Sequence, residues 1–340
     1  MSVVALDARL TRQMSVGMQT YVRELVRRLP QVAPDMQFRI FDRGANFGID
    51  EQIRLPLAIR QARPDLTHFL SMYVPLFASK PFVLTVHDLI HLRYPQYFKP
   101  KVRPYYQTVV RSACARAHAV ITDDPRTAID LQTFLGVHPD KVRVIPLGVE
   151  ERYLEPVQPH QAARPYMIYA GNHRAHKDLP TMLRAWTLLP PEVELDLYMT
   201  GDDDFGGQLE AYHRTRGRVV MLGQVSLDAL ASYYAGARAL MHPAICEGFG
   251  LPMLEAMAVG CAVIASSGAI PSVLEDAALT FAPGDARAAA CALERVLRDE
   301  GFARNLVIQG QTQARALTWN RCAQATAQVY REIVEEQARR

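Results

Sequence analysis

Short apolar runs alternate with helical patterns along almost the whole chain, and this alternation limits the folds that the sequence can adopt. In the first half, the strand-like runs include VVALDA, FRIFDR, LTHFL, PFVLTVHD, AVITDD and KVRVIPLGV. The pattern restarts with YMIYAG, VELDLYMTG, RVVMLGQ, ALMHPA and CAVIAS. Strands that are buried on both faces and connected by helices form parallel, doubly wound sheets. The sequence therefore predicts an α/β protein with two Rossmann-like domains that face each other across a cleft.

The break between the two halves predicts the domain boundaries. Residues 150–165 carry three prolines and are typical of a connecting segment. The last helical pattern has no strand after it, so we expect it to pack back on the first domain. The expected organisation is a first domain over 1–152, a linker over 153–164, a second domain over 165–318 and a final helix over 319–340.

Composition narrows the class of protein. The 340 residues, 49% hydrophobic and 21% charged, are typical of a globular protein with two domains. A net charge of +3 is too small to indicate nucleic acid as the main partner. Five scattered cysteines without metal-ligand spacing suit a reducing compartment. Because neither a signal peptide nor an uninterrupted apolar span is found, we expect a cytoplasmic protein, with peripheral contact at the inner membrane as an open question.

The segment HPAICEGFGLPMLEAMAVGCAVIA, residues 242–265, predicts a short strand, a glycine-bearing turn, a helix and a second strand. Pro252 suits the first position of that helix, where its missing N–H would be unpaired in any case. A helix N-terminus carries unpaired N–H groups and a partial positive charge, so it attracts anions. We therefore expect a phosphate to bind the backbone amides of Phe249, Gly250 and Leu251.

Two carboxylates flank this turn with the spacing E-x7-E. Glu255 falls about one turn into the helix, where its side chain can reach a vicinal diol such as a ribose. Glu247 lies before the helix, nearer to whatever is attached to the phosphate. A buried strand–helix unit whose glycines only satisfy the turn is the alternative interpretation. The paired acids favour a ligand that combines an anion with hydroxyl groups.

The stretch EGFGLPMLEAMAVGCAVIAS resembles the donor-binding signature of the retaining glycosyltransferases of family 4, which have the GT-B fold. Other segments match that family in the right order from Val4 to about Val334. IYAGNHRAHKDLPTMLRAW is similar to its phosphate loop, and LDARLTRQMSVGMQTYVREL and LTVHDLIHLRYPQYF are similar to its acceptor-side domain. The resemblance implies a GT-B fold and transfer of a sugar from a nucleotide-diphosphate sugar, with no metal ion and no cofactor.

The resemblance also implies a role for each matching residue. Glu255 would hold the ribose hydroxyls of the donor, and Glu247 would lie near the transferred sugar and the charge that develops at its anomeric carbon. Lys177 would neutralise the diphosphate leaving group. From the first domain, His87 would face the donor sugar. Gly17, in the loop before the first helix, would let the backbone approach the diphosphate or the acceptor.

One position departs from the family pattern. Family members carry an arginine directly after the glycine of the phosphate loop, whereas here Asn172 follows Gly171 and only the later Lys177 keeps its place. Arg174 is the candidate that replaces the lost charge. Because a related subgroup has Gly-Asn at this point, we interpret the change as variation within the family.

We expect a retaining, metal-independent glycosyltransferase of surface polysaccharide or lipopolysaccharide biosynthesis. The resemblance makes mannose from GDP-mannose the first hypothesis for the donor, and a glycan or lipid-linked glycan the expected acceptor. A dinucleotide dehydrogenase is disfavoured, because the first strand is followed by LDARLTRQMSVG and not by G-x-G-x-x-G. A sugar-nucleotide epimerase of the same fold and a non-catalytic nucleotide-binding homologue are the alternatives.

Four other features are weaker signals. GDDD, residues 201–204, is similar to a metal-binding acidic motif, but a solvated turn is the simpler interpretation. HRAH lacks further zinc ligands, so we expect His173 and His176 to be exposed loop residues. Cys246 has no assigned base and is interpreted as a small buried side chain. Residues 91–106 mix basic and aromatic side chains, which form either a solvated face or a surface for anionic lipid headgroups or a lipid-diphosphate acceptor.

Overall fold

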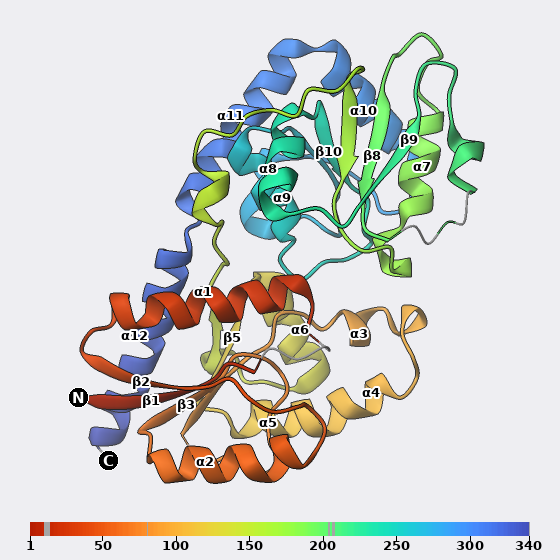
Figure 1. The fold of residues 1–340 in the computed structure, drawn as a ribbon. Helices are drawn as coiled ribbons and strands as arrows, with labels where there is room; N and C mark the ends of the chain where they lie inside the picture. The colour runs from red at the N-terminus through yellow and green to blue at the C-terminus, as the bar shows by residue number, and fades with distance from the viewer. Residues whose placement is uncertain (10–13, 80, 203–204, 206–207, 340) are drawn as a thin grey trace. The chain divides into compact units, whose positions relative to one another are not determined.

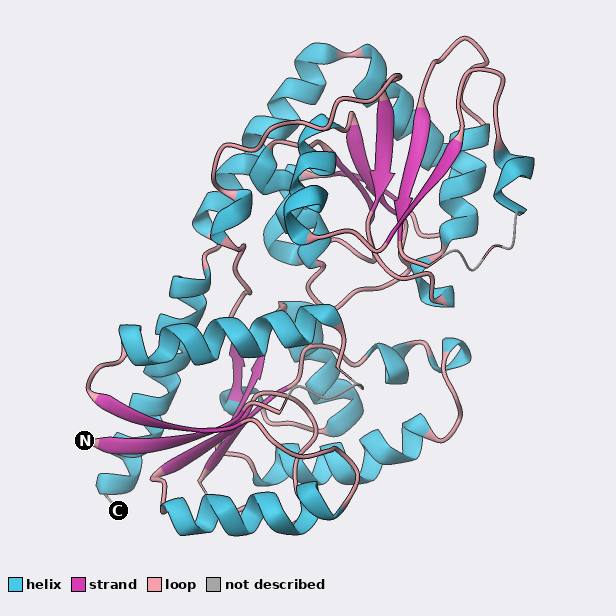
Figure 2. Cartoon of the chain, in the orientation of Figure 1, coloured by secondary structure: helices cyan, strands magenta, loops and turns pink. Residues whose placement is uncertain are grey.

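The computed structural model describes residues 1–340 except 10–13, 80, 203–204, 206–207 and 340. The chain divides into two compact units, one formed by Met1–Gly148 with Thr318–Arg340 and the other by Val149–Leu317. Each unit has its own parallel sheet, its own helices and its own core (Figure 1, Figure 2). Residues 153–164, expected to be a linker, are part of the second unit.

The first unit is built on a six-stranded sheet in the order β2-β1-β3-β4-β5-β6, in which all neighbouring strands are parallel. The inner strands β3, β4 and β5 are buried at every position, because helices cover both faces of the sheet. The strands are β1 (Ser2–Asp7), β2 (Met36–Phe41), β3 (Leu66–Phe69), β4 (Phe82–Thr85), β5 (Ala119–Thr122) and β6 (Val142–Val144).

The helices Val16–Val32 and Pro125–Leu135 of the first unit start where a short polar side chain replaces the missing backbone acceptor. Ser15 accepts a hydrogen bond from the backbone N–H of Met18 at 3.3 Å, and Asp124 does the same for Arg126 at 2.8 Å. The helices are α1 (Val16–Val32), α2 (Leu55–Ala62), α3 (Ile90–Arg93), α4 (Val102–Tyr105), α5 (Arg111–Arg116), α6 (Pro125–Leu135) and α12 (Trp319–Ala338), with π-helical turns at Asp50–Arg54 and Tyr106–Val110.

The last helix, α12, lies beside α1 in the first unit (Figure 1). Its buried residues recur at helical spacing and include Trp319 and Tyr330. The Tyr330 hydroxyl is 2.6 Å from Nδ1 of His68 on β3, and Nε2 of the same ring is 2.8 Å from the Thr85 hydroxyl on β4. Burial lowers the pKa of His68 to about 3, so this ring is neutral and ties α12 to the sheet.

The second unit has a six-stranded parallel sheet in the order β12-β11-β10-β7-β8-β9. Its core surrounds the fully buried Trp186. The strands are β7 (Tyr166–Tyr169), β8 (Asp196–Thr200), β9 (Val219–Gly223), β10 (Ala239–His242), β11 (Val263–Ser266) and β12 (Leu279–Phe281), and the helices are α7 (Leu179–Thr187), α8 (Leu227–Gly236), α9 (Leu251–Val259), α10 (Ala286–Arg298) and α11 (Glu300–Ala316).

Two Rossmann-like domains are thus confirmed, each a parallel sheet with flanking helices. In both sheets the strand order reverses next to the first strand, between β1 and β3 in the first unit and between β7 and β10 in the second. Open sheets of this kind bind ligands outside the carboxyl ends of the strands at such a reversal. Within the described part of the chain, the helices are all too short or too polar to cross a membrane.

The start of α12 packs so tightly against the rest of the first unit that adding a single methyl group there should lower stability. A Cβ on Gly148 would lie 2.1 Å from the backbone nitrogen of Trp319. We expect Gly148→Ala to lower the free energy of unfolding by about 1–3 kcal/mol, measured by denaturant unfolding. Gly48→Ala is the control, because a Cβ there meets no heavy atom within 4 Å. Equal stability of the two variants would contradict this packing.

Candidate active site

The candidate site lies in the second unit, where two loops leave the carboxyl ends of β7 and β10 (Figure 2). Residues 170–178 connect β7 to α7, and residues 243–250 connect β10 to α9. The two strands are neighbours at the reversal of strand order. The backbone N–H of Ile245 donates a hydrogen bond to the carbonyl of His176 at 2.9 Å, which holds the loops together. The fold therefore brings the phosphate-loop and E-x7-E segments to one place.

The side chains of Lys177 and His242 meet at the carboxylate of Glu247. Lys177 Nζ donates a hydrogen bond to Oε1 of Glu247, and Nε2 of His242 lies 2.7 Å from the same oxygen. The side chains of Lys177 and Glu247 are each 12% exposed, and that of His242 is 1% exposed. Burial raises the pKa of Glu247. The charge of Lys177 and the hydrogen bond from His242 lower this pKa by more than burial raises it, so the pKa stands well below its usual value. Glu247 is therefore a fixed negative charge.

His242 was not identified from the sequence. Its ring ends β10, and its Nδ1 is buried without a hydrogen-bond partner among the described residues. A proton on Nδ1 would be an unsatisfied buried donor, whereas a proton on Nε2 is donated to the Glu247 carboxylate. This network assigns the Nε2-protonated tautomer. A histidine five residues before the first glutamate was the available signal in the sequence.

The mouth of α9 has the backbone geometry that the glycine turn predicts. Gly250 precedes the helix in the left-handed region, with φ of 74°, and a Cβ there would lie 2.2 Å from the Met253 methyl group. In the same unit, side chains cap α8, α10 and α11, but α7 and α9 have no side-chain cap. The first N–H groups of the two helices at this site are thus left without a side-chain acceptor. The buried Phe249 and half-buried Leu251 flank the turn.

Glu255 lies one turn into α9 and faces two fully buried tyrosines, Tyr153 and Tyr234, that the sequence analysis did not single out. Burial and the negative charge of Glu150 raise the pKa of Glu255 to about 8, against the lowering effect of the two hydroxyls and of Arg152. Nε of Arg152 is 3.4 Å from Glu150, and the arginine also pairs with Asp228. Without a ligand, Glu255 thus holds its proton at neutral pH.

The loop after β7 is ordered by its own polar groups. Oδ1 of Asn172 accepts a hydrogen bond from the backbone N–H of Arg174 at 3.3 Å, and its carbonyl accepts one from the Tyr169 hydroxyl at 2.6 Å. The side chain of Arg174 is exposed. The expectation that both histidines of this loop are exposed is wrong, since His176 is buried and Nε2 of the half-buried His173 is bonded to the Thr200 carbonyl at 2.8 Å.

In the first unit, His87 follows β4 and is paired with Asp123, which follows β5. Nδ1 of His87 is 2.6 Å from Oδ2 of Asp123, and both side chains are buried. Burial lowers the pKa of His87, but the carboxylate of Asp123 raises it to a value above normal. The backbone carbonyl of Leu70 also raises the pKa of this ring, whereas Nε2 makes no hydrogen bond of normal geometry among the described residues. Asp123 was not identified from the sequence. Gly17 lies in the first turn of α1 and not, as expected, in the loop before it.

The remaining sequence motifs contribute no metal ligands within the described residues, where no group of three potential metal ligands is found. Of the GDDD motif, Asp203 and Asp204 lie outside the described residues. Cys246, which is half-buried beside Glu247, forms no disulfide.

Comparisons with known proteins agree with this fold. A sucrose-phosphate synthase from Thermosynechococcus elongatus superposes with a TM-score of 0.77 at 23% identity, covering 99% of this chain and 100% of that one. Anabaena Alr3699/HepE in complex with UDP-glucose superposes with a TM-score of 0.76 at 16% identity, covering 97% and 99%. These likenesses show that the chain has the GT-B fold.

Sequence comparisons give the family. Residues 164–299 match the family described as Glycosyl transferases group 1, and residues 30–153 match Glycosyltransferase Family 4. The chain therefore belongs to the group 1 glycosyltransferases of family 4. It is 28% identical to the O-antigen chain mannosyltransferase B of Escherichia coli over 81% of this chain and 76% of that protein. It is 24% identical to Escherichia coli WbdA, of which it spans 38%.

The role of His242 can be tested by replacing its ring. We expect His242→Phe, which keeps the bulk but removes the donor to Glu247, to lower turnover of the nucleotide sugar about 10- to 100-fold, because a hydrogen bond to a charged group contributes about 1.5–3 kcal/mol. The pKa of Glu247 then rises, so activity is lost at a higher pH on the acid side. His242→Gln restores an N–H near Nε2 and should recover much of the rate. Wild-type turnover and pH profile in His242→Phe would exclude this role.

Proposed function

We propose that the chain transfers a sugar from a nucleotide-diphosphate sugar to a glycan or lipid-linked glycan with retention of anomeric configuration, in surface polysaccharide biosynthesis. The observation that carries the proposal is the Lys177–Glu247–His242 network beside the uncapped N-terminus of α9. Mannose from GDP-mannose is the first choice of donor. It is supported by the names of similar proteins, which include O-antigen chain mannosyltransferases of Escherichia coli and Salmonella typhimurium and a mannosyltransferase of Mycolicibacterium hassiacum.

The charges of this network fit the breaking of a sugar–phosphate bond. When that bond breaks, positive charge develops on the sugar ring and negative charge on the departing diphosphate. Lys177, already held at the loop after β7, would pair with the diphosphate together with the amides of Phe249, Gly250 and Leu251. Glu247 would keep its hydrogen bond from His242 and face the positive anomeric carbon. Its low pKa keeps it charged without a proton to transfer. The departing phosphate would then accept the proton of the acceptor hydroxyl.

Other proposed contacts surround this centre. Glu255 would accept both ribose hydroxyls, and Arg174 would add a positive charge near the diphosphate from the loop that Asn172 orders. From the first domain, His87, whose protonated form Asp123 favours, would present Nε2 to a hydroxyl of the donor sugar. Gly17 would bring the first turn of α1 close to the diphosphate or the acceptor.

We also propose that residues 91–106 contact an anionic membrane surface where a lipid-linked acceptor resides. Lys99, Lys101 and Arg103 are exposed. The aromatic rings of this segment pack largely on one another, with the ring centroids of His91 and Phe98 4.1 Å apart. The segment would therefore contribute positive charge more than apolar surface.

The donor assignment is tested by binding and turnover with two variants. Nucleoside diphosphates and their mannose and glucose conjugates are screened by thermal shift, because a ligand of the native state raises Tm. We expect GDP-mannose to give the largest shift. We expect Glu255→Ala to weaken its binding about 10- to 100-fold through loss of the ribose hydrogen bonds. Lys177→Ala should lower kcat about 100-fold with a smaller change in affinity.

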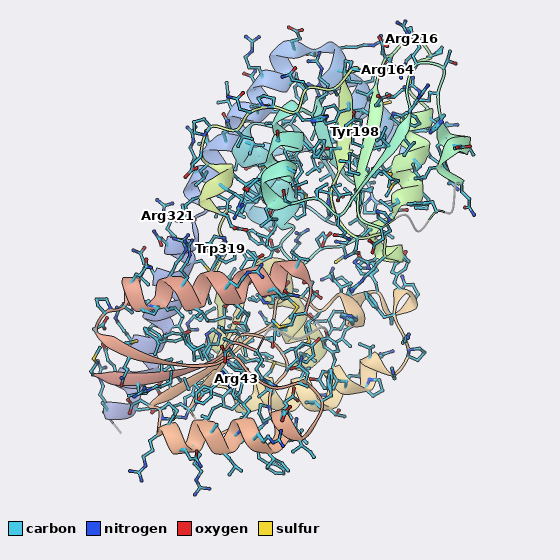
Figure 3. The ribbon with its side chains drawn as sticks, viewed as in Figure 1. Arg43, Arg164, Tyr198, Arg216, Trp319 and Arg321 are labelled. Atoms are coloured by element: carbon cyan, nitrogen blue, oxygen red, sulfur yellow. The ribbon has the colours of Figure 1, made fainter. Side chains whose placement is uncertain are left out.

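Arg216→Ala is the matched control for loss of a positive charge. Arg216 pairs with Glu194 and lies near the amino end of β9, at the edge of the sheet away from this site (Figure 3). It should leave both Kd and kcat unchanged. If no nucleotide shifts Tm, or if the Glu255 and Lys177 variants match the control, the donor site is assigned wrongly.

Donor affinity should depend on pH through Glu255. Its carboxyl group, with a pKa of about 8, must lose a proton before it can accept both ribose hydroxyls. Affinity therefore rises with pH, by about eightfold between pH 7 and pH 8.5 if only the ionised form binds. Titration calorimetry with the nucleotide sugar measures the effect. Glu255→Gln should bind with no such dependence, and an unchanged slope in this variant would assign the pH effect elsewhere.

A further inference from the structure

Among the exposed large apolar side chains of the first unit, six lie on three neighbouring segments and are exposed by 47% to 83% of their area. A folded monomer usually leaves such residues scattered singly, and a group of them marks an interaction surface. The six come from the loop after β2, from the helical stretch that ends in α2, and from the loop after β3. We call them the apolar patch: Phe47, Ile49, Ile53, Leu57, Leu76 and Phe77.

Backbone geometry and two hydrogen bonds bring these three segments together. Ile49, Ile53 and Leu57 recur at every fourth position of a continuous helical stretch, so they project from one side of it. The backbone N–H of Leu76 donates to Oε1 of Gln52 at 2.9 Å, which fixes the loop after β3 against this stretch. The backbone N–H of Phe47 donates to Glu51 at 3.3 Å. The two loops and the helical stretch therefore form one surface.

The core of the first unit does not require this exposed side. The same helical stretch buries Leu55 and Ile59 on its inner side, where they join the core under the sheet. Ile53 and Leu57 lie on the outer side and are each 53% exposed. A polar outer side would satisfy the fold equally well. The packing of the unit therefore does not account for the apolar residues on this side.

A positively charged segment borders the patch. The ring of Phe47 packs edge-on against Tyr105 in α4, with centroids 5.3 Å apart. Lys99, Lys101 and Arg103, just before Tyr105, are exposed. Residues 89–122 contain six arginines and lysines and no aspartate or glutamate. Asp50, a partly exposed acid within the patch segment, is paired with Arg54 at 2.7 Å. Apolar side chains beside the positive charges of residues 99–103 match the interface of an anionic bilayer, in which headgroups are negative and the region below them is apolar.

The position of the patch in the sheet agrees with a lipid-linked acceptor. Phe47 and Phe77 lie in loops that follow β2 and β3, and His87 follows the parallel strand β4. The carboxyl ends of parallel strands share one edge of a sheet, so the patch and His87 lie at the same edge. A headgroup-linked acceptor would meet the first unit at this edge.

We propose that the apolar patch inserts into the interfacial layer of an anionic membrane while Lys99, Lys101 and Arg103 bind its headgroups, which places the acceptor edge of the first unit at the lipid surface. This inference rests on the proposed function, because it takes the acceptor to be lipid-linked. It adds the inserted residues, which lie outside the segment 91–106. A protein partner would need no preference for anionic lipid, and a second copy of the chain would bring the same positive charges together.

The test is co-sedimentation of the full chain with vesicles. One set contains phosphatidylglycerol and phosphatidylcholine, and the other contains phosphatidylcholine alone. The wild type should bind the anionic set and bind the neutral set at least about tenfold more weakly. Ile49→Ser with Phe77→Ser should lower binding to the anionic set about tenfold or more. Leu188→Ser with Ile308→Ser is the matched control, because these side chains are 52% and 54% exposed in the second unit.

Each other outcome overturns the proposal. These outcomes are no binding of the wild type to anionic vesicles, equal loss in the control, and equal binding to neutral vesicles. Self-association of the wild type that the patch variant abolishes, seen by sedimentation velocity, would assign the patch to a second copy. Thermal shift with GDP-mannose on all variants separates the two proposals. Normal nucleotide binding without vesicle binding rejects only the membrane surface, and the reverse rejects only the donor site.

Discussion

Each sheet of this enzyme is parallel and covered on both faces, and this constraint determines where its polar chemistry lies. Two neighbouring parallel strands can be connected only by a crossover. Every strand of the sheet therefore ends at the same edge, and a helix returns the chain to the opposite edge. At the reversal of strand order, the chain turns to opposite faces of the sheet after β7 and after β10. In folds of this kind, this leaves a crevice beside the N-termini of the two helices that follow. Lys177 and Glu247 are separated by 70 positions in sequence, yet they meet there because the sheet topology brings their loops together.

The fold was predictable because its signal is repeated. Apolar strand-like runs recur along the chain and several of the helices between them are amphipathic, so errors in single elements do not change the architecture. Family resemblance supplied Glu247, Glu255 and Lys177 because those residues lie in local motifs. Whether these residues and His87 act as proposed is a question for the experiments above.

The partners of these residues were not predictable, for a physical reason. His242 matters through its register in β10, and Asp123 because it follows β5, the strand beside the one that His87 follows. Tyr153 and Tyr234 reach Glu255 from separate elements. Such contacts depend on how distant segments pack, and single residues of these types carry no local signal. The same holds for the exposed side of the helical stretch at 50–62, since an apolar helix in sequence is normally assigned to a core.

The return of α12 has a consequence for the order in which the protein is made. Trp319 and Tyr330 fill the interior of the first unit, while the whole of the second unit is synthesised before them. As the chain leaves the ribosome, the sheet of the first unit emerges before the second unit but remains without α12 until the second unit has been made. The second unit, whose sequence is continuous, can finish folding earlier. During synthesis, the surface of the first unit that α12 later covers is therefore the apolar surface that stays exposed longest. This surface would be the main binding site for chaperones.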